Sequence, residues 1–157
     1  MPLALALDRL CDVVEALTPV EQPRVGFTCI DDDQGESLGL AEAGPGYDRR
    51  FELLLDSVAD DGEAGPTGGR QRASLRLRVR YSADGSRRAA DARMGQDFHA
   101  IRKGLLVPTG WQSVTTGIDS IDPPASFSVE DIVAAQGDGP VARIMTIPVT
   151  VRYHEEV

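Results

Sequence analysis

The chain has 157 residues, 41% hydrophobic and 26% charged, which suffices for one domain with an apolar core but is short for two. Its 25 acidic and 16 basic side chains give a formal net charge of -9, so its overall field repels nucleic acid. No apolar run reaches the length of a membrane span, and no basic segment precedes the apolar start. We therefore expect a single α+β domain over residues 1–157 in a soluble protein made in the cytoplasm.

The first third of the chain predicts a helix, a strand and a long loop. Apolar side chains recur at helical spacing over residues 3–17, which predicts an amphipathic helix. A β-branched and aromatic run predicts a strand at residues 24–30. Residues 31–46 are acidic and glycine-rich without a sustained period, and we expect a loop of unusual length there. Cys11 and Cys29 lack a Cys-x-x-Cys spacing and are interpreted as buried thiols.

The most regular pattern lies at residues 72–81, where apolar and polar side chains alternate strictly, as in a half-buried β-strand. A similar alternation at residues 47–56 predicts the strand that pairs with it. The turn-rich residues 59–70 between them predict an extended hairpin tip. Strands this long exceed what a small core needs, so we expect the hairpin to project toward a partner.

Four arginines share the polar face of the strand at residues 72–81, on a sheet side that we expect the core to leave uncovered. Like charges two residues apart repel unless they are screened or paired, and guanidinium groups pair well with carboxylates. We interpret the row as an interface with acidic residues of another copy, the alternative being a row that is merely solvated. The residues predicted for this interface are Arg72, Arg76, Arg78 and Arg80 with Asp31, Asp32, Asp33, Asp60 and Asp61.

A second helix is predicted from a cap at Asp84 or Ser86 to about Leu106. We expect Phe98 and Ile101 on its apolar face to pack against the sheet. The expected face consists of Ala90, Met94, Phe98, Ile101 and Leu105, and the expected sheet partners are Leu75, Leu77 or Val149.

The last third of the chain predicts mainly β-strands. Strands are predicted at residues 111–121, 127–133 and 141–153, separated by proline- and glycine-containing turns. Pro148 interrupts the last of them and cannot donate to a ladder, which favours an edge position or a bulge there.

The sequence holds no recognisable catalytic, cofactor or metal motif, and no cofactor is expected. His99 is interpreted as a partly buried helix residue, and His154 as exposed in a charged C-terminal tail. Asp31 to Asp33 with Glu36 lack the order of a calcium loop and favour a solvated acidic segment over a metal site. The glycines at residues 65–70 lack the lysine of a phosphate loop.

Several segments together resemble the tail terminator proteins of long-tailed bacteriophages, which also act in tail completion and head-tail joining. They are an N-terminal helix, a long hairpin ending at residues 75–81, the helix at residues 91–106 and a final strand at residues 142–153. The resemblance covers nearly the whole chain and rests on the pattern of elements rather than on a diagnostic motif.

The elements predicted along the chain follow the order α-β-β-β-α-β-β, with two helices and about five strands. The resemblance implies an α+β fold in which the helices pack beside a mixed, mainly antiparallel sheet. It further implies a six-fold ring in the virion, at the neck end of the tail. There the ring would end polymerisation of the tail tube protein and dock the head-tail connector, with DNA only passing through the lumen. An acidic lumen would repel DNA and let it slide.

Two other interpretations stay open. One is a different neck or tail-tube component, because many of these share related sheets and ring assembly. The other is a small α+β ligand-binding domain or enzyme, in which the loop at residues 31–46 would act as a lid over an apolar pocket.

Overall fold

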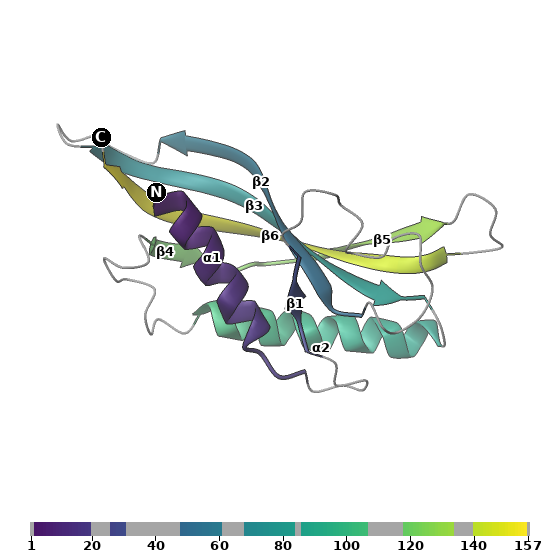
Figure 1. The fold of residues 1–157 in the computed structure, drawn as a ribbon. Helices are drawn as coiled ribbons and strands as arrows, with labels where there is room; N and C mark the ends of the chain where they lie inside the picture. The colour runs from purple at the N-terminus through teal and green to yellow at the C-terminus, as the bar shows by residue number, and fades with distance from the viewer. Residues whose placement is uncertain are drawn as a thin grey trace.

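The computed structural model describes residues 2–19, 26–30, 48–60, 68–83, 86–106, 118–133 and 140–156. These residues form two helices beside a mixed, mostly antiparallel sheet, which is the α+β class expected from the sequence (Figure 1). They hold six strands, which is the number of strand segments predicted along the chain, whereas the expected order has five. The elements are α1 (Pro2–Glu15), β1 (Thr28–Cys29), β2 (Arg50–Asp60), β3 (Gly68–Ser82), α2 (Arg87–Leu106), β4 (Ile118–Asp122), β5 (Ser128–Val133) and β6 (Pro140–Glu156).

The sheet is built around one long antiparallel pair. β3 pairs along its whole length with β6, from Gly68 opposite Glu156 to Ser82 opposite Ala142. β2 lies on the other side of β3, and the short β1 joins β2 in parallel, which makes the sheet mixed. On its second side β6 pairs with β4 near one end and with β5 near the other. The predicted hairpin of two long strands is therefore present as β2 and β3.

Both helices cover the same face of this sheet (Figure 1). The alternation predicted for residues 72–81 is confirmed, because every second side chain of β3 faces the helices and is buried. Phe98 and Ile101 of α2 belong to the same core cluster as Leu75, Leu77 and Val149. The buried side chains of β3 are Ala73, Leu75, Leu77, Val79 and Tyr81.

Local signals account for where α2 begins and how closely it approaches α1. The Ser86 hydroxyl accepts a hydrogen bond from the Ala89 amide at 3.4 Å, so Ser86 is the cap and α2 begins at Arg87. Near the other end of α2, a Cβ atom added to Gly104 would lie 2.9 Å from the Cδ2 atom of Leu17. Glycine at this position therefore lets α2 lie close to the residues that follow α1.

Several strand boundaries differ from the prediction, including the end of β6, which continues to Glu156 instead of residue 153. Residues 24 and 25 of the strand predicted at 24–30 lie outside the described residues, and within 26–30 only Thr28–Cys29 form a strand. β2 begins at Arg50, after the predicted start at residue 47. The hairpin strands also continue into the predicted tip, since Asp60 pairs with Gln71 and β3 begins at Gly68. The predicted loop at 31–46, the start of the strand predicted at 111–121 and the centre of the predicted tip lie outside the described residues.

Pro148 lies in an interior strand and nevertheless meets little conflict with the ladder. On one side it is opposite Arg76 of β3. On the other side, β4 pairs with β6 only as far as Thr150, and β5 begins to pair at Thr146. Because residues 123–127 run between these two strands without joining the ladder, β6 is locally an edge at Pro148, which is where a proline is tolerated.

Candidate interaction surface on the β2–β3–β6 sheet

The outer face of β3 carries the predicted row of arginines, and the chain itself supplies carboxylates to most of it. Arg78 lies directly opposite Glu52 of β2, and its Nη1 atom is 2.7 Å from the Glu52 Oε1 atom. Its Nη2 atom is also 3.8 Å from a carboxylate oxygen of Glu130 in β5. Arg78 is therefore held between carboxylates from the strands on both sides of the β3–β6 pair.

A bulge in β2 places the partner of Arg76. The pairing register shifts between Leu55 and Ser57, so that Asp56 has no partner residue on β3. The Asp56 carboxylate instead reaches the Arg76 Nε atom at 2.7 Å. Both side chains stay 39 to 46% exposed, so this ion pair contributes little to stability and remains available to another molecule.

The two ends of the row differ. Arg80 is completely buried, and its Nη1 atom is 3.5 Å from the Asp48 carboxylate. Arg72 is exposed, and it has no ion pair with any residue that the structure describes. The expectation that the row lies uncovered was therefore wrong for Arg80, and Arg76 and Arg78 have partners within the chain. The reason is that β2 brings Glu52 and Asp56 alongside the arginines.

Of the acidic residues predicted to face this row, only Asp60 is described. Its carboxylate accepts a hydrogen bond from the Gln71 side chain at 2.8 Å, so that it lies on the hairpin and not opposite the arginines. Asp31, Asp32, Asp33 and Asp61 lie outside the described residues. A role for these residues between copies of the chain stays a prediction.

β2 has an open edge with exposed apolar side chains. On the side away from β3, it pairs with β1 only at Arg50 and Phe51, and no other described strand continues along it. Leu55 and Val58 face the helix side of the sheet, yet they are 47% and 43% exposed. An unpaired strand edge beside exposed apolar side chains is a common site for pairing with another chain.

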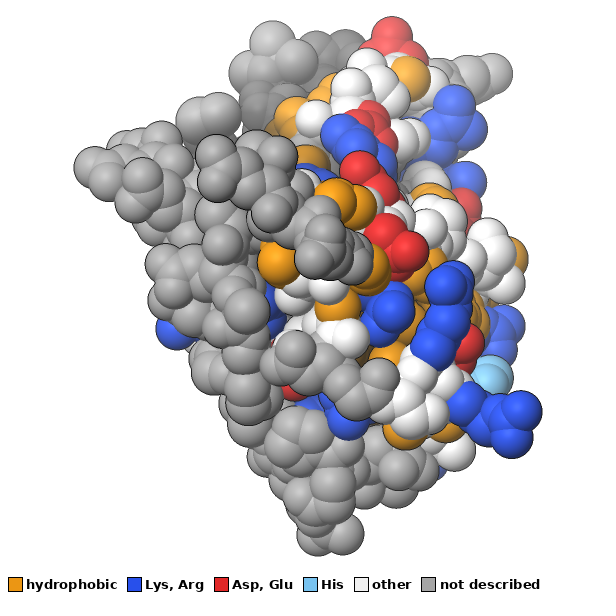
Figure 2. Space-filling view, turned by 90° about the vertical axis from the view of Figure 1, so that its right-hand side faces the viewer, with side chains coloured by type: hydrophobic (Ala, Val, Ile, Leu, Met, Phe, Trp, Pro, Cys, Tyr) orange, Lys and Arg blue, Asp and Glu red, His pale blue; other side chains and the backbone are white. Residues whose placement is uncertain are grey.

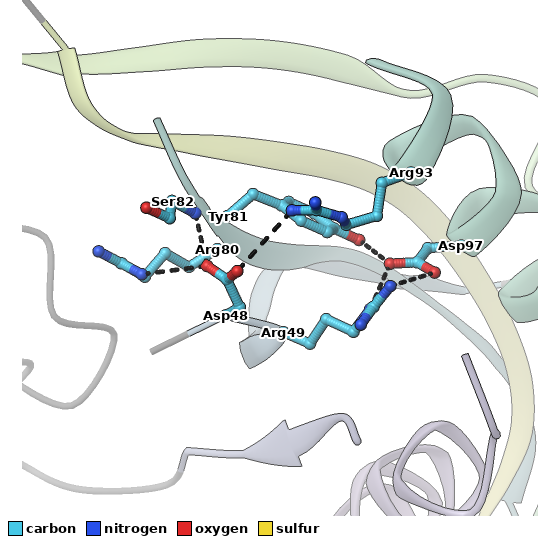
Figure 3. A network of polar contacts seen from close by, with 7 residues as sticks. All are labelled: Asp48, Arg49, Arg80, Tyr81, Ser82, Arg93 and Asp97. Atoms are coloured by element: carbon cyan, nitrogen blue, oxygen red, sulfur yellow. Dashed lines mark hydrogen bonds and ion pairs between the residues drawn. The ribbon is translucent and has the colours of Figure 1, made fainter. Parts of the chain in front are cut away.

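A buried polar network anchors the point where the chain enters β2 (Figure 3). The Arg49 guanidinium donates two hydrogen bonds to Asp97 of α2, at 2.7 and 3.3 Å, and the Tyr81 hydroxyl donates a third at 2.6 Å. All three side chains are buried. Burial, and secondarily the Asp97 charge, raise the pKa of Tyr81 well above its usual value near 10, so Tyr81 stays protonated.

The backbone of Arg49 is part of the same anchor. Its amide donates to the Arg80 carbonyl at 2.8 Å, and its carbonyl accepts from the Thr28 amide at 3.1 Å. Arg49 therefore bridges β1 and β3, and it does so with φ at 60°, in the left-handed region that arginine rarely occupies. The two hydrogen bonds and the Asp97 ion pair hold this unfavourable conformation in place.

Asp48 forms the second half of the network in Figure 3. Its carboxylate accepts a hydrogen bond from the Ser82 amide at 2.6 Å and lies within 4 Å of the Arg80 and Arg93 guanidinium groups. Burial raises the pKa of Asp48, and the Ser82 hydrogen bond and the arginines oppose this effect. The network thus links the start of β2, the end of β3 and α2.

Sequence reasoning did not identify this network, although one signal for it was present. Asp97 lies in phase with the apolar face of α2, three residues after Met94 and four before Ile101. A carboxylate at such a position is buried only if it is paired. Asp48 and Arg49, by contrast, looked like the first residues of an alternating strand, and nothing in that pattern indicated a turn.

A groove of about 620 Å³ lies between α1 and the β1–β2 edge. Its walls carry the carboxylates of Asp8, Asp12 and Glu15 and the two thiols, and neither histidine lines it. Cys11 and Cys29 are half-buried and hydrogen-bonded to each other, not fully buried as expected.

The two histidines lie on the surface, outside the groove. His99 is exposed on α2, which corrects the expected partial burial. His154 is exposed as predicted, but it lies in β6 rather than in a tail. Within the described ranges, no three His, Cys, Asp or Glu side chains gather in a way that could hold a metal ion. The residues interpreted as a solvated acidic segment around Asp31 lie outside those ranges.

The face seen in Figure 2 carries basic, acidic and hydrophobic side chains next to one another. Neither described helix is long and apolar enough to cross a membrane. No protein-family model and no curated protein matches the sequence.

Proposed function

We propose that the chain is a structural virion protein of the tail terminator type, which forms a ring at the end of a phage tail tube. The ring ends tube polymerisation and joins the tail to the head connector. The observation that carries the proposal is the open edge of β2 with its exposed Leu55 and Val58. An exposed strand edge of this kind is a template for pairing with another chain, and native proteins usually cover or block it.

The two sides of the sheet differ, which is compatible with a ring. The open edge of β2 lies on one side of the sheet, while β4 and β5 form the other side. If the edge of one copy binds a different surface of the next, the contact is heterologous, and such contacts close into rings when the rotation between copies allows it. The resemblance described above implies six copies.

The distribution of charge supports a ring through which DNA passes without being bound. The net charge is -9, and Arg76, Arg78 and Arg80 already have carboxylate partners within the chain. Guanidinium groups paired in this way are less available to phosphate groups, and the acidic excess repels them.

Light scattering across a range of protein concentrations, with and without the tail tube protein, tests the proposal directly. The expected result is a free species of six times the 16.8 kDa monomer mass, or the same mass added to the tail tube when the tube protein is present. A chain that stays a 16.8 kDa monomer under all these conditions would contradict the proposal.

A matched pair of variants tests the role of the β2 edge. Val58→Lys places a charge on the exposed edge, where lysine blocks strand pairing, and should give a folded monomer. Leu106→Lys is the control, because Leu106 is 46% exposed but lies at the end of α2. Equal assembly by both variants would exclude the β2 edge as the interface.

Exchanging the charges of an ion pair tests whether Arg78 contacts another molecule or only residues of its own chain. Arg78→Glu combined with Glu52→Arg and Glu130→Gln keeps the ion pair across β2 and β3 with reversed orientation and removes the carboxylate that Arg78 also meets. If a neighbouring copy or the tube binds the arginine row, this triply substituted chain folds but does not assemble. Normal assembly would show that Arg78 acts only within its own chain.

The alternative of a ligand-binding domain would use the groove beside α1. That groove is lined by carboxylates and thiols as well as apolar side chains, whereas the expected ligand site was an apolar pocket. The surface of β2 therefore favours assembly over this alternative.

A further inference from the structure

Two thiols from different elements meet at the base of the groove between α1 and β1. Cys11 lies in the third turn of α1, and Cys29 is the last residue of β1. Their Sγ atoms are 2.8 Å apart. A sulfur–sulfur bond is about 2.0 Å long, so a movement of less than about 1 Å would bring the two atoms to bonding distance.

The surroundings hold the two cysteines in this arrangement. The Cys29 amide donates a hydrogen bond to the Glu15 carboxylate at 2.8 Å, which ties β1 to the last turn of α1. Both cysteines pack against the core cluster, next to Leu53. Because the helix and the strand are each fixed to the sheet, the approach of the thiols is a property of the fold and does not depend on a flexible side chain alone.

The thiols remain accessible to a small molecule. Both are only half-buried, and both line the groove of about 620 Å³. The groove also carries Asp8, Asp12 and Glu15, whose negative charge disfavours the entry of an anionic oxidant such as glutathione disulfide. A small neutral oxidant such as hydrogen peroxide does not meet this electrostatic barrier.

We propose that Cys11 and Cys29 form a redox-sensitive pair, which peroxide oxidises to a disulfide that ties α1 to β1. One thiolate attacks a peroxide oxygen, the O–O bond breaks, and a sulfenic acid and hydroxide form. The second sulfur then attacks the sulfenic sulfur, the disulfide bond forms, and the oxygen leaves as water. In total two thiols lose two electrons and two protons, and the peroxide becomes two waters.

The environment disfavours a thiolate at this pair. The hydrogen bond with Cys29, burial and the nearby charges of Glu15 and Asp8 raise the pKa of Cys11. Oxidation by peroxide should therefore be faster at higher pH. The disulfide forms within a single chain, so this proposal does not depend on the assembly function proposed above.

Peptide mapping after peroxide treatment tests this proposal. The purified full chain is reduced, freed of reductant, treated with limited hydrogen peroxide, quenched with catalase and digested with trypsin after alkylation. Cleavage at Arg9, Arg24 and Arg49 places Cys11 in the peptide 10–24 and Cys29 in the peptide 25–49. The expected product is these two peptides joined, about 2 Da lighter than their sum. Glutathione disulfide at the same concentration should give this product more slowly.

Single serine variants provide the controls. Cys11→Ser and Cys29→Ser each leave a single thiol that peroxide should convert to a sulfenic acid, which a dimedone probe captures, and neither variant should give the joined peptides. The oxidised wild-type chain should unfold at a higher urea concentration than the reduced chain, and Cys11→Ser should show no such increase. Disulfide-linked dimers, separate overoxidised peptides, unreacted thiols or an unchanged urea midpoint in the wild type would overturn the proposal.

Discussion

Replacement of Asp97 by asparagine tests whether the buried network holds the start of β2 in place. The carboxylate accepts two hydrogen bonds from Arg49 and one from Tyr81, and all three side chains are buried. Asparagine keeps one acceptor oxygen but removes the charge, which leaves the Arg49 guanidinium buried without a counterion. Breaking such a buried pair costs about 3 to 5 kcal/mol. Since one acceptor remains, we expect a loss of about 3 kcal/mol, a large part of the typical total of about 5 to 15 kcal/mol.

Urea unfolding followed by circular dichroism measures this loss, and the melting temperature should fall by about 6 to 12 °C. The matched control is Asp91→Asn, at an exposed position of the same helix, which should change stability by less than about 0.5 kcal/mol. Tyr81→Phe removes only the hydrogen bond of the hydroxyl, and it should cost about 1.5 to 3 kcal/mol. If Asp97→Asn unfolds at the same urea concentration as Asp91→Asn, the network does not stabilise the fold and this reasoning is refuted.

Four further measurements test other parts of the structure. Gly95→Ala should stabilise α2 by about 0.5 to 1 kcal/mol in urea unfolding, because the added Cβ meets open space. Gly104→Ala should give a smaller gain in stability, because its Cβ would lie 2.9 Å from a leucine methyl carbon. Phe98→Ala should cost about 3 to 5 kcal/mol, since this ring is 7% exposed and packs on another aromatic ring at 5.0 Å. His99→Ala at the adjacent exposed position should cost less than about 0.5 kcal/mol, and a larger loss would show that the histidine has a structural role. The raised pKa of Tyr81 contributes stability that is present below the unfolded value near 10 and is lost at higher pH. Between about pH 8 and about pH 11 the urea midpoint should therefore fall more for the wild type than for Tyr81→Phe, and equal falls would contradict the assignment.

The sequence alone determined the class of the fold and the orientation of its longest strand. The strict alternation at residues 72–81 indicated which side chains of β3 face the core, and the structure buries each of them. The spacing of apolar residues located both helices to within two or three residues at each end. These features were accessible because each depends on the periodicity of a single element.

Only the tertiary structure determined what the arginines and the buried charges contact. Arg76 meets Asp56 because a bulge shifts the register of β2, and Arg80 is buried because a turn brings Asp48 beside it. Asp97 meets Arg49 across 48 positions of sequence. Such contacts depend on strand register and on how a helix lies on the sheet, and neither is encoded in the period of one segment. The sequence could therefore locate the charged face of β3, but only the packed fold could identify the partners of its charges.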